Sequence, residues 1–320
     1  KNHLCILYNA IFKSASFPEQ WARSIIFPLH KKGNINDVNN YRGISLMDVC
    51  GKIYTCILNN RLKSFVDLMG MYPECQAGFR RGYSTIDNIF TLQSVVQKYL
   101  SKSKCRFYCL FVDFRKAFDS INRNLLWYVM LDNNIHGYMF NTIRDMYSKT
   151  MSCVKESKFS VTEYFESLSG VRQGCVLSPL LFSLFVNQLY VEMEENSDRG
   201  IFLCPEFAEL YLLLYADDLC IFADSVISLQ RKIDTLHKFC LKWGLSVNFD
   251  KTEVLVFRKG GILKNTEKWY LGDIKLNIST YYSYLGLLFS NRLSWSMAVH
   301  NLVNTANKAL RSVKVFRSEE

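Results

Sequence analysis

The sequence predicts an α+β fold in which a sheet carries helices on one face, and three observations support this prediction. Arg106 to Val112 is a short apolar run of the kind found in buried strands, and a helical pattern follows from Ser120. Leu210 to Ala223 consists of two apolar half-strands separated by a pair of aspartates, which is a hairpin pattern. Val226 to Trp243 has helical periodicity and ends at Gly244. The order strand, helix, hairpin, helix is typical of α+β proteins.

The other expected elements follow the same periodicities. An apolar stripe near the N-terminus predicts a helix, and an apolar stretch with proline in its first turn predicts another. The expected helices are Leu4–Phe12, Pro179–Met193 and Trp295–Arg317, and the expected strands are Phe159–Leu168, Leu245–Phe249, Val254–Phe257 and Tyr281–Phe289.

Length and charge limit the kind of protein. A chain of 320 residues is near the upper limit for one continuous core, so we expect two or three subdomains around a shared cleft. The net charge of +10 fits a polyanionic partner. The charge is concentrated early, because residues 1–106 contain 15 Lys and Arg against 6 Asp and Glu. We therefore expect the N-terminal third to face the polyanion.

Cysteine usage indicates an intracellular, reduced protein. The eleven cysteines are an odd number, scattered through apolar runs, and no C-x-x-C pair occurs. A structural zinc site is not expected, since the five histidines are far apart. The most apolar stretch, Val176–Val191, is interrupted by polar residues and proline, so we expect no membrane span. The helical start and uncapped end suggest a piece of a longer polypeptide.

The paired aspartates Asp217 and Asp218 are the first candidate site. An Asp-Asp pair can be an ordinary turn, because aspartate tolerates turn conformations. Here both flanks are apolar, and no Lys or Arg lies nearby in sequence to neutralise the carboxylates. If Asp113, after another buried strand, lies beside them, three oxygen ligands converge without His or Cys, which suits magnesium or manganese. Two such ions, ~4 Å apart, support phosphoryl transfer. We expect attack of a primer 3′-hydroxyl on a nucleotide α-phosphate.

Several segments in order resemble the motifs of reverse transcriptases. They are FVDFRKAFDSI (Phe111–Ile121), GVRQGCVLSPLLF (Gly170–Phe182), YADDL (Tyr215–Leu219), WGLSVNFDKTEVLVF (Trp243–Phe257) and YLGLLFS (Tyr284–Ser290). The upstream segments LHKKG with NYRGISL (Leu29–Leu46) and QAGFRRGYSTID (Gln76–Asp87) resemble the non-LTR, LINE-like branch. The resemblance covers most of the chain.

This resemblance implies a right-hand polymerase that copies an RNA template from a DNA primer, using deoxynucleoside triphosphates and two Mg²⁺ ions, with Mn²⁺ as an alternative. The implied organisation is fingers at 1–104, palm at 105–290 with part of 122–165 returning to the fingers, and a truncated thumb from 291 to 320. It also implies a longer polyprotein with an endonuclease and a full thumb, located in the cytoplasm and nucleus.

The resemblance assigns catalytic roles residue by residue. Asp113, Asp217 and Asp218 match the metal ligands, although Asp113 alone could be a helix cap. Lys251 matches the lysine proposed to protonate pyrophosphate, and it could equally cap strand ends. Phe118 matches the bulky residue that blocks a ribose 2′-hydroxyl, while a core aromatic would look the same from periodicity.

Nucleotide and template contacts are assigned in the same way. Lys31 or Lys32, with Lys31 preferred, and Arg42 match the basic residues that grip the triphosphate. Gln173 and Gly174 match the pair that lies against the nucleotide and template base, with a polar turn as the alternative. Arg80 and Arg81 beside aromatics resemble single-strand binders, and Tyr284, Leu285 and Gly286 match the primer grip or form a plain core hairpin.

Three other functions remain open. An RNA-dependent RNA polymerase uses similar carboxylates, but Phe118 leaves little room for a ribose 2′-hydroxyl. A group II intron maturase is closer, and the QAGFR segment argues against it. A domesticated nucleic-acid binder without catalysis is a third class, although it gains nothing from three acids that face phosphate.

Overall fold

The computed structural model describes residues 2–102, 105–157, 159–196, 199–202 and 209–317, and the chain divides into two compact units. Unit 1 comprises residues 1–79, 115–189 and 239–246, and unit 2 comprises residues 80–114, 190–238 and 247–320. The chain therefore passes between the units several times. The fingers, palm and thumb ranges predicted from sequence stay a prediction, although residues 122–165 do group with the N-terminal segment.

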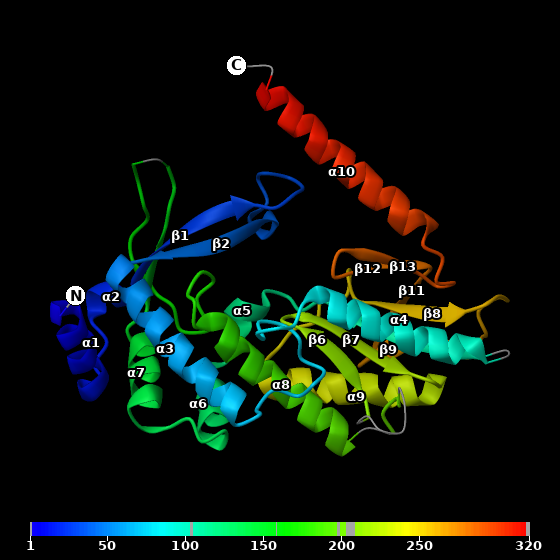
Figure 1. Ribbon diagram of the computed structural model, residues 1–320, viewed down its shortest axis with the longest axis horizontal. Coiled ribbons are helices and arrows are strands. Elements are labelled where there is room, and N and C mark those ends of the chain that lie inside the picture. The colour runs from blue at the N-terminus through cyan, green and yellow to red at the C-terminus, as the bar shows by residue number, and fades with distance from the viewer. Residues whose placement is uncertain (1, 103–104, 158, 197–198, 203–208, 318–320) are drawn as a thin grey trace. The chain divides into compact units, whose positions relative to one another are not determined.

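Unit 1 combines helices with a four-stranded sheet (Figure 1). Its strands are β1 (Arg23–His30), β2 (Tyr41–Met47), β4 (Met151–Val154) and β5 (Phe165–Glu166), in the order β2-β1-β4-β5. Strand β1 pairs antiparallel with β2 and parallel with β4, so β2 forms an edge. The helical elements are α1 (Asn2–Ser14), α2 (Glu19–Ala22), η1 (Val38–Asn40), α3 (Val49–Leu68), α5 (Ala117–Ser120), α6 (Arg123–Asp132), α7 (Gly137–Ser148) and most of α8 (Ser178–Asn196).

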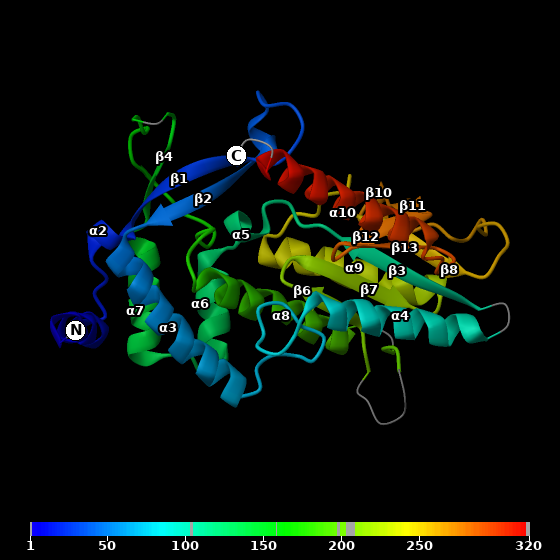
Figure 2. The same cartoon turned by 45° about the horizontal axis from the view of Figure 1, so that its top comes forward.

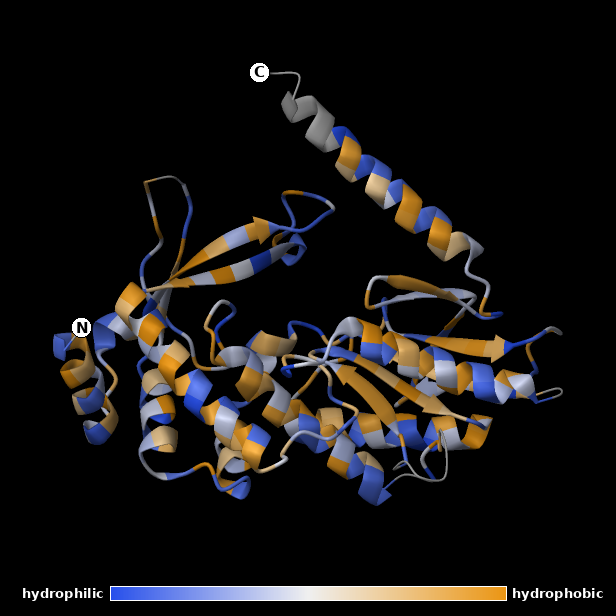
Figure 3. Cartoon of the chain, in the orientation of Figure 1, coloured by the Kyte–Doolittle hydropathy of each residue, from blue (hydrophilic) through white to orange (hydrophobic). Residues whose placement is uncertain are grey.

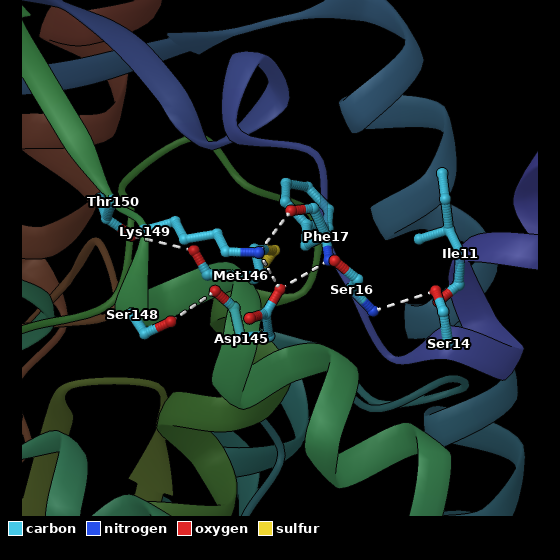
Figure 4. A network of polar contacts seen from close by, with 9 residues as sticks. All are labelled: Ile11, Ser14, Ser16, Phe17, Asp145, Met146, Ser148, Lys149 and Thr150. Carbon is cyan, nitrogen blue, oxygen red and sulfur yellow. Dashed lines mark hydrogen bonds and ion pairs between the residues drawn. The ribbon is translucent and has the colours of Figure 1, made fainter.

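A polar network fastens the N-terminal segment of unit 1 to α7 (Figure 4). The Asp145 carboxylate accepts hydrogen bonds from the Phe17 backbone N–H at 2.6 Å and from the Lys149 ammonium at 2.8 Å. The Lys149 ammonium also donates to the Phe17 carbonyl at 3.1 Å. Because Phe17 is completely buried, these bonds fix the connection between α1 and α2 against α7.

Unit 2 is built on a five-stranded sheet in the order β11-β8-β3-β7-β6. These strands are β3 (Arg106–Val112), β6 (Leu212–Tyr215), β7 (Asp218–Ala223), β8 (Glu253–Arg258) and β11 (Asn277–Ser279). All neighbours pair antiparallel except β11 and β8. Two hairpins, β9 (Tyr270–Leu271) with β10 (Ile274–Lys275) and β12 (Tyr281–Tyr284) with β13 (Leu287–Ser290), and the helices α4 (Thr85–Ser101), α9 (Val226–Trp243, shared with unit 1) and α10 (Ser296–Arg317) complete it.

Both faces of this sheet are covered, and Figure 2 shows α4 and α9 on different sides of it. On one face, Phe107, Cys109 and Phe111 pack with apolar residues of α4 and of the β12–β13 hairpin. On the other face, Tyr108 contacts Trp269, whose indole N–H donates to the Val226 carbonyl at the start of α9. Burial on both faces explains why the strands are nearly continuous apolar runs (Figure 3).

Most elements predicted from sequence are confirmed, since β3, α9 and the β6–β7 hairpin lie where the periodicity placed them. Three predictions are wrong. Phe159–Leu168 is not a continuous strand, because only Phe165–Glu166 belongs to β5. Leu245–Phe249 makes a single bridge, between Val247 and Phe114. Helices cover both faces of the sheet in unit 2, not one.

The described cysteines are all free thiols, and six of the ten are buried. This agrees with their interpretation as reduced core residues. No helix in the described part of the chain is both long and apolar enough to cross a membrane.

Candidate active site

The β6–β7 hairpin presents the paired aspartates at the end of the unit 2 sheet. Tyr215 pairs with Asp218, which leaves Ala216 and Asp217 as a two-residue turn. Ala216 has a left-handed backbone with φ of 59°, and its side chain is buried. An alanine in this conformation is under mild strain, because its Cβ crowds the following carbonyl. The strained turn holds both carboxylates at one end of the sheet, since the apolar residues before and after them are buried.

Asp113 lies beside this pair. Val112 of β3 is opposite Leu219 of β7, so the same register sets Asp113 opposite Asp218. Residues opposite one another on antiparallel strands have side chains only about 5 Å apart. The pKa of Asp218 is raised to about 6, first by lost hydration and then by the negative charges of Asp217 and Asp113, while Lys251 opposes the shift. The three predicted carboxylates therefore gather at one place.

Residues 248–252 wrap around Asp113 and fix it. The Asn248 side-chain amide donates to the Asp113 carboxylate at 2.9 Å, and the Asn248 backbone N–H donates to the Asp113 carbonyl at 2.8 Å. The Asp113 backbone N–H donates to the Thr252 hydroxyl at 3.2 Å. The Lys251 ammonium lies 3.2 Å from the same carboxylate. Side chain and backbone of Asp113 are thus both held by one segment.

The chemistry of these side chains fits a divalent cation. Three carboxylates share one sheet end, and burial together with the charges of Asp217 and Asp113 raises the pKa of Asp218, which Lys251 opposes. Hard oxygen donors of this kind suit Mg²⁺ or Mn²⁺. Among the described residues, no three His, Cys, Asp or Glu side chains are arranged so as to hold a metal ion. Instead, Asp113 makes its contacts with Asn248 and Lys251.

The predicted gate residue Phe118 lies in unit 1, in the short helix α5. Its ring stacks on Phe182 of α8, with centroids 4.5 Å apart and planes at 12°. Its carbonyl accepts a hydrogen bond from the Val171 backbone N–H at 2.8 Å. Gly170 has φ of 75°, and a Cβ there would come within 2.6 Å of the Asp119 carbonyl oxygen. Only glycine therefore lets this loop lie against α5.

Gln173 and Gly174 lie against the edge strand β2. The Ser45 backbone N–H donates to the Gln173 carbonyl at 2.7 Å, and a Cβ on Gly174 would lie 2.7 Å from the Ser45 carbonyl oxygen. The adjacent Arg172 is buried and donates to the Ala22 carbonyl and the Thr150 hydroxyl. Burial lowers the pKa of the Arg172 guanidinium. The loop is therefore anchored on both sides of Gln173.

The side chain of Gln173 is held by Asp119. Its amide nitrogen lies 3.0 and 2.9 Å from the two Asp119 carboxylate oxygens. Lost hydration raises the pKa of Asp119, and Gln173, Lys116 and Lys31 oppose this shift. Lys31 therefore lies near enough to act on Asp119, which favours it over Lys32 as the predicted nucleotide contact. Unit 1 therefore brings Lys31 and Gln173 together with Asp119, the residue that follows Phe118.

Arg42 lies on β2 and pairs in register with Leu29 of β1. Its side chain is exposed, three residues before Ser45 on the same strand. In the described structure no hydrogen bond or ion pair occupies its guanidinium, so Arg42 is available to an anion.

The predicted template and primer residues lie in unit 2. The Arg80 guanidinium lies over the Tyr83 ring, 4.0 Å from its centroid, as expected from the mixture of cations and aromatics. Arg81 is exposed. Leu285 and Gly286 form the tight β12–β13 turn, with φ of 49° and 85°. The Tyr284 side chain is buried in the core against Phe111, so a primer contact in this turn falls to Leu285 and Gly286.

Sequence reasoning missed four residues of these sites: Asn248, Thr252, Asp119 and Ser45. All four lie inside the quoted motif segments. Each acts by a hydrogen bond to a neighbouring segment, and such partners only become visible in the folded chain.

Comparison with known proteins identifies what this chain is similar to. Residues 29–289 match the family model described as reverse transcriptase (RNA-dependent DNA polymerase). The chain is 28% identical to a probable RNA-directed DNA polymerase from transposon BS of Drosophila melanogaster, over 92% of this chain and 32% of that protein. It is 25% identical to the RNA-directed DNA polymerase from mobile element jockey of Drosophila funebris, over 98% of this chain and 36% of that protein. The chain thus spans about a third of the length of these relatives.

Among solved structures, similar folds come from telomerases. Apo telomerase from Candida tropicalis, truncated from its C-terminal domain, matches with a TM-score of 0.58 and 14% identity, over 89% of this chain and 57% of that one. Telomerase from Candida albicans, in complex with a fragment of telomeric RNA, matches with a TM-score of 0.54 and 13% identity, over 90% and 50%. The α+β fold and the resemblance to non-LTR reverse transcriptases are confirmed.

Proposed function

The chain belongs to the reverse transcriptase family, and from this premise we propose that it extends a DNA primer on an RNA template by nucleotidyl transfer. The observation that carries the proposal is the gathering of Asp113, Asp217 and Asp218 at one end of the unit 2 sheet. Three carboxylates gathered in this way are costly unless a cation joins them, and the pKa of Asp218 is raised accordingly.

Reverse transcriptases use divalent metal ions, and we assign two Mg²⁺ ions to this chain, with Mn²⁺ as an alternative. Asp113, Asp217 and Asp218 would hold them. Bound ions of this kind stabilise negative charge on the attacking and leaving oxygens of a phosphoryl transfer. Asn248 and Thr252 keep Asp113 in one orientation, because they bind its carboxylate and its backbone.

Lys251 is the candidate proton donor to pyrophosphate. Its ammonium is more than half exposed and lies 3.2 Å from Asp113, so it can turn toward a ligand without leaving a buried charge behind. A lysine in this position can supply a proton to a leaving phosphate oxygen.

Unit 1 supplies the nucleotide contacts in this proposal. Lys31 and Arg42 bind the triphosphate: the Lys31 ammonium acts as a compact positive charge, and the planar Arg42 guanidinium donates paired hydrogen bonds. Phe118 blocks the 2′-hydroxyl of a ribonucleotide, and its stacking on Phe182 keeps the ring in place. Gln173 and Gly174 lie against the nucleotide and the template base.

The template and primer contacts come from unit 2. Arg80 and Arg81 hold the template strand, with Tyr83 as a stacking partner. The tight turn of Leu285 and Gly286 contacts the primer. Because the chain spans about a third of its relatives, we propose that a full thumb and an endonuclease belong to a longer polyprotein.

Primer extension tests the proposal. A labelled DNA primer annealed to an RNA template is incubated with the protein, Mg²⁺ and either deoxynucleotides or ribonucleotides. We expect extension with deoxynucleotides that stops when the metal is chelated, and little extension with ribonucleotides. Equal or better use of ribonucleotides would indicate an RNA polymerase, and binding of the template without extension under any condition would indicate a non-catalytic binder.

A further inference from the structure

The hydrogen bonds between Asp119 and Gln173 define the orientation of the Gln173 side-chain amide. The amide nitrogen of Gln173 is a donor only, and it faces both oxygens of the Asp119 carboxylate at 2.9 and 3.0 Å. An ionised carboxylate accepts hydrogen bonds and cannot donate, so it can bind the nitrogen end of the amide and not the oxygen end. Asp119 therefore decides which way the Gln173 amide points.

The other end of the amide is left available. Among the described residues, the side-chain oxygen of Gln173 receives no hydrogen bond. The Gln173 backbone cannot turn to change this, because its carbonyl is bound by Ser45 and the next residue, Gly174, touches the Ser45 carbonyl. The half-buried side chain thus presents a hydrogen-bond acceptor.

Asp119 is itself held in place. Its own carbonyl accepts a hydrogen bond from the Ser169 hydroxyl at 3.3 Å, and its backbone N–H donates to the Lys116 carbonyl at 2.8 Å. Gly170 packs directly on its backbone. Since Phe118 is the preceding residue and stacks on Phe182, the carboxylate that orients Gln173 is carried by the same short helix as the predicted gate.

We propose that Asp119 is a positioning residue that fixes the Gln173 amide with its oxygen available to accept a hydrogen bond from a donor on the incoming nucleotide. A deoxynucleoside triphosphate carries one hydroxyl donor on its sugar, the 3′-hydroxyl, and this group is the proposed partner. The inference rests on the proposed function, because it assigns the ligand of a residue in that site.

The test is a double-mutant cycle of Asp119→Leu and Gln173→Leu in single-nucleotide extension, with Asp132→Leu as the control. Asp132 is an exposed aspartate of unit 1 at the end of α6. We expect Asp119→Leu to raise the KM for deoxynucleotides about tenfold or more, as for loss of a charge-assisted hydrogen bond. The double variant should be no worse than Gln173→Leu alone, Asp119→Glu should recover part of the loss, and Asp132→Leu should match the parent.

Dideoxynucleotides identify the donor. The parent should prefer deoxynucleotides over 2′,3′-dideoxynucleotides, and Asp119→Leu should lose most of this preference. A second readout does not depend on synthesis: the side-chain amide NMR signal of ¹⁵N-labelled Gln173, identified by its loss in Gln173→Leu, should move in Asp119→Leu and stay in Asp132→Leu.

Three results would overturn the inference: multiplicative effects of the two substitutions, an unchanged dideoxynucleotide preference in Asp119→Leu, or an unmoved Gln173 signal. Each leaves the proposed function intact as long as the parent extends the primer. A parent that fails to extend while its Gln173 signal responds to Asp119→Leu would instead contradict the proposed function, and with it the nucleotide as the partner of Gln173.

Discussion

At the residue scale, the carboxyl of Asp218 has an unusual proton affinity. Its pKa is raised to about 6, above the value near ~3.9 of an aspartate in an unfolded chain. Between these values the folded state binds more protons than the unfolded state, so the metal-free protein should lose stability as pH rises from about 4 to about 6.

Urea unfolding in the presence of a chelator measures this effect. The free energy of unfolding should fall between pH 4.5 and pH 6.5 by more in the parent than in Asp218→Asn, which cannot titrate. Asp119 also has a raised pKa and contributes equally to both proteins, so its contribution cancels in their difference. The same pH dependence in both proteins would show that the pKa of Asp218 is not raised in the folded protein.

Phe118 makes a second prediction at this scale. Phe118→Val removes the ring that stacks on Phe182 and opens space beside the sugar, so discrimination against ribonucleotides should fall by roughly tenfold or more. Phe118→Tyr keeps the ring and should keep the discrimination. The measurement is the ratio of kcat/KM for a deoxynucleotide and its ribonucleotide. If Phe118→Val rejects ribonucleotides as well as the parent does, Phe118 is a core aromatic and not a gate.

At the scale of elements, the loop before Gln173 depends on Gly170. An alanine there would be strained by the positive φ and would also press on the Asp119 backbone at 2.6 Å. Gly137 has a similar φ of 65° with open space around its Cβ position, so it is a matched control. Gly137→Ala should cost about 1–2 kcal/mol of unfolding free energy, and Gly170→Ala should cost more.

The two variants should also differ in function. Gly170→Ala should raise the KM for deoxynucleotides, because displacement of Asp119 disturbs Gln173, whereas Gly137→Ala should leave it unchanged. Stability is measured by denaturation and KM by primer extension. Equal losses of stability and equal KM values in the two variants would mean that the loop accommodates an alanine at position 170 without displacing Asp119.

The elements also show how far sequence reasoning reaches. The β3 strand, the β6–β7 hairpin and α9 were predictable because their burial patterns are regular over their whole length. Phe159–Leu168 alternates like a strand, yet Phe159, Val161 and Phe165 are exposed, and apolar alternation without a partner to cover it forms only two residues of strand. The segment after Gly244 is similar, because its backbone hydrogen bonds with Asp113 and Arg115 make one isolated bridge and no longer strand ladder.

In the candidate site, the aspartates could be predicted from the sequence, whereas the residues that hydrogen-bond to the site residues could not. Aspartates in apolar runs stand out in a sequence, so Asp113, Asp217 and Asp218 could be chosen. Asn248 and Asp119 do not stand out, because ordinary polar residues gain their roles from contacts between segments far apart in the chain. The preference for Lys31 over Lys32 as a nucleotide contact stays a prediction, and the influence of Lys31 on the pKa of Asp119 favours it.

At the scale of the whole molecule, the net charge of +10 predicts salt-dependent binding of primer–template. The affinity should fall linearly with salt concentration on logarithmic axes, and Arg80→Ala should reduce the slope by about 0.9 if Arg80 contacts one phosphate. Lys259→Ala is the control. Glu253, at one end of β8, pairs with Phe111 and so lies near the acids, whereas Lys259 follows the opposite end of β8. An equal change in both variants would mean that only the total charge matters.

The most direct test of the central claim compares two aspartates in equivalent turns. Asp217 follows Ala216 (φ 59°) in the β6–β7 turn, and Asp273 follows Gly272 (φ 60°) in the β9–β10 turn, where no other carboxylate is paired across the strands. We expect Asp217→Asn to reduce Mg²⁺-dependent extension of a DNA primer on an RNA template by more than about 100-fold, the upper end of losses for residues that only support metal ligands. Asp273→Asn should extend like the parent. Full activity in Asp217→Asn, with the parent and Asp273→Asn both active, would contradict the assignment of the catalytic centre to these carboxylates.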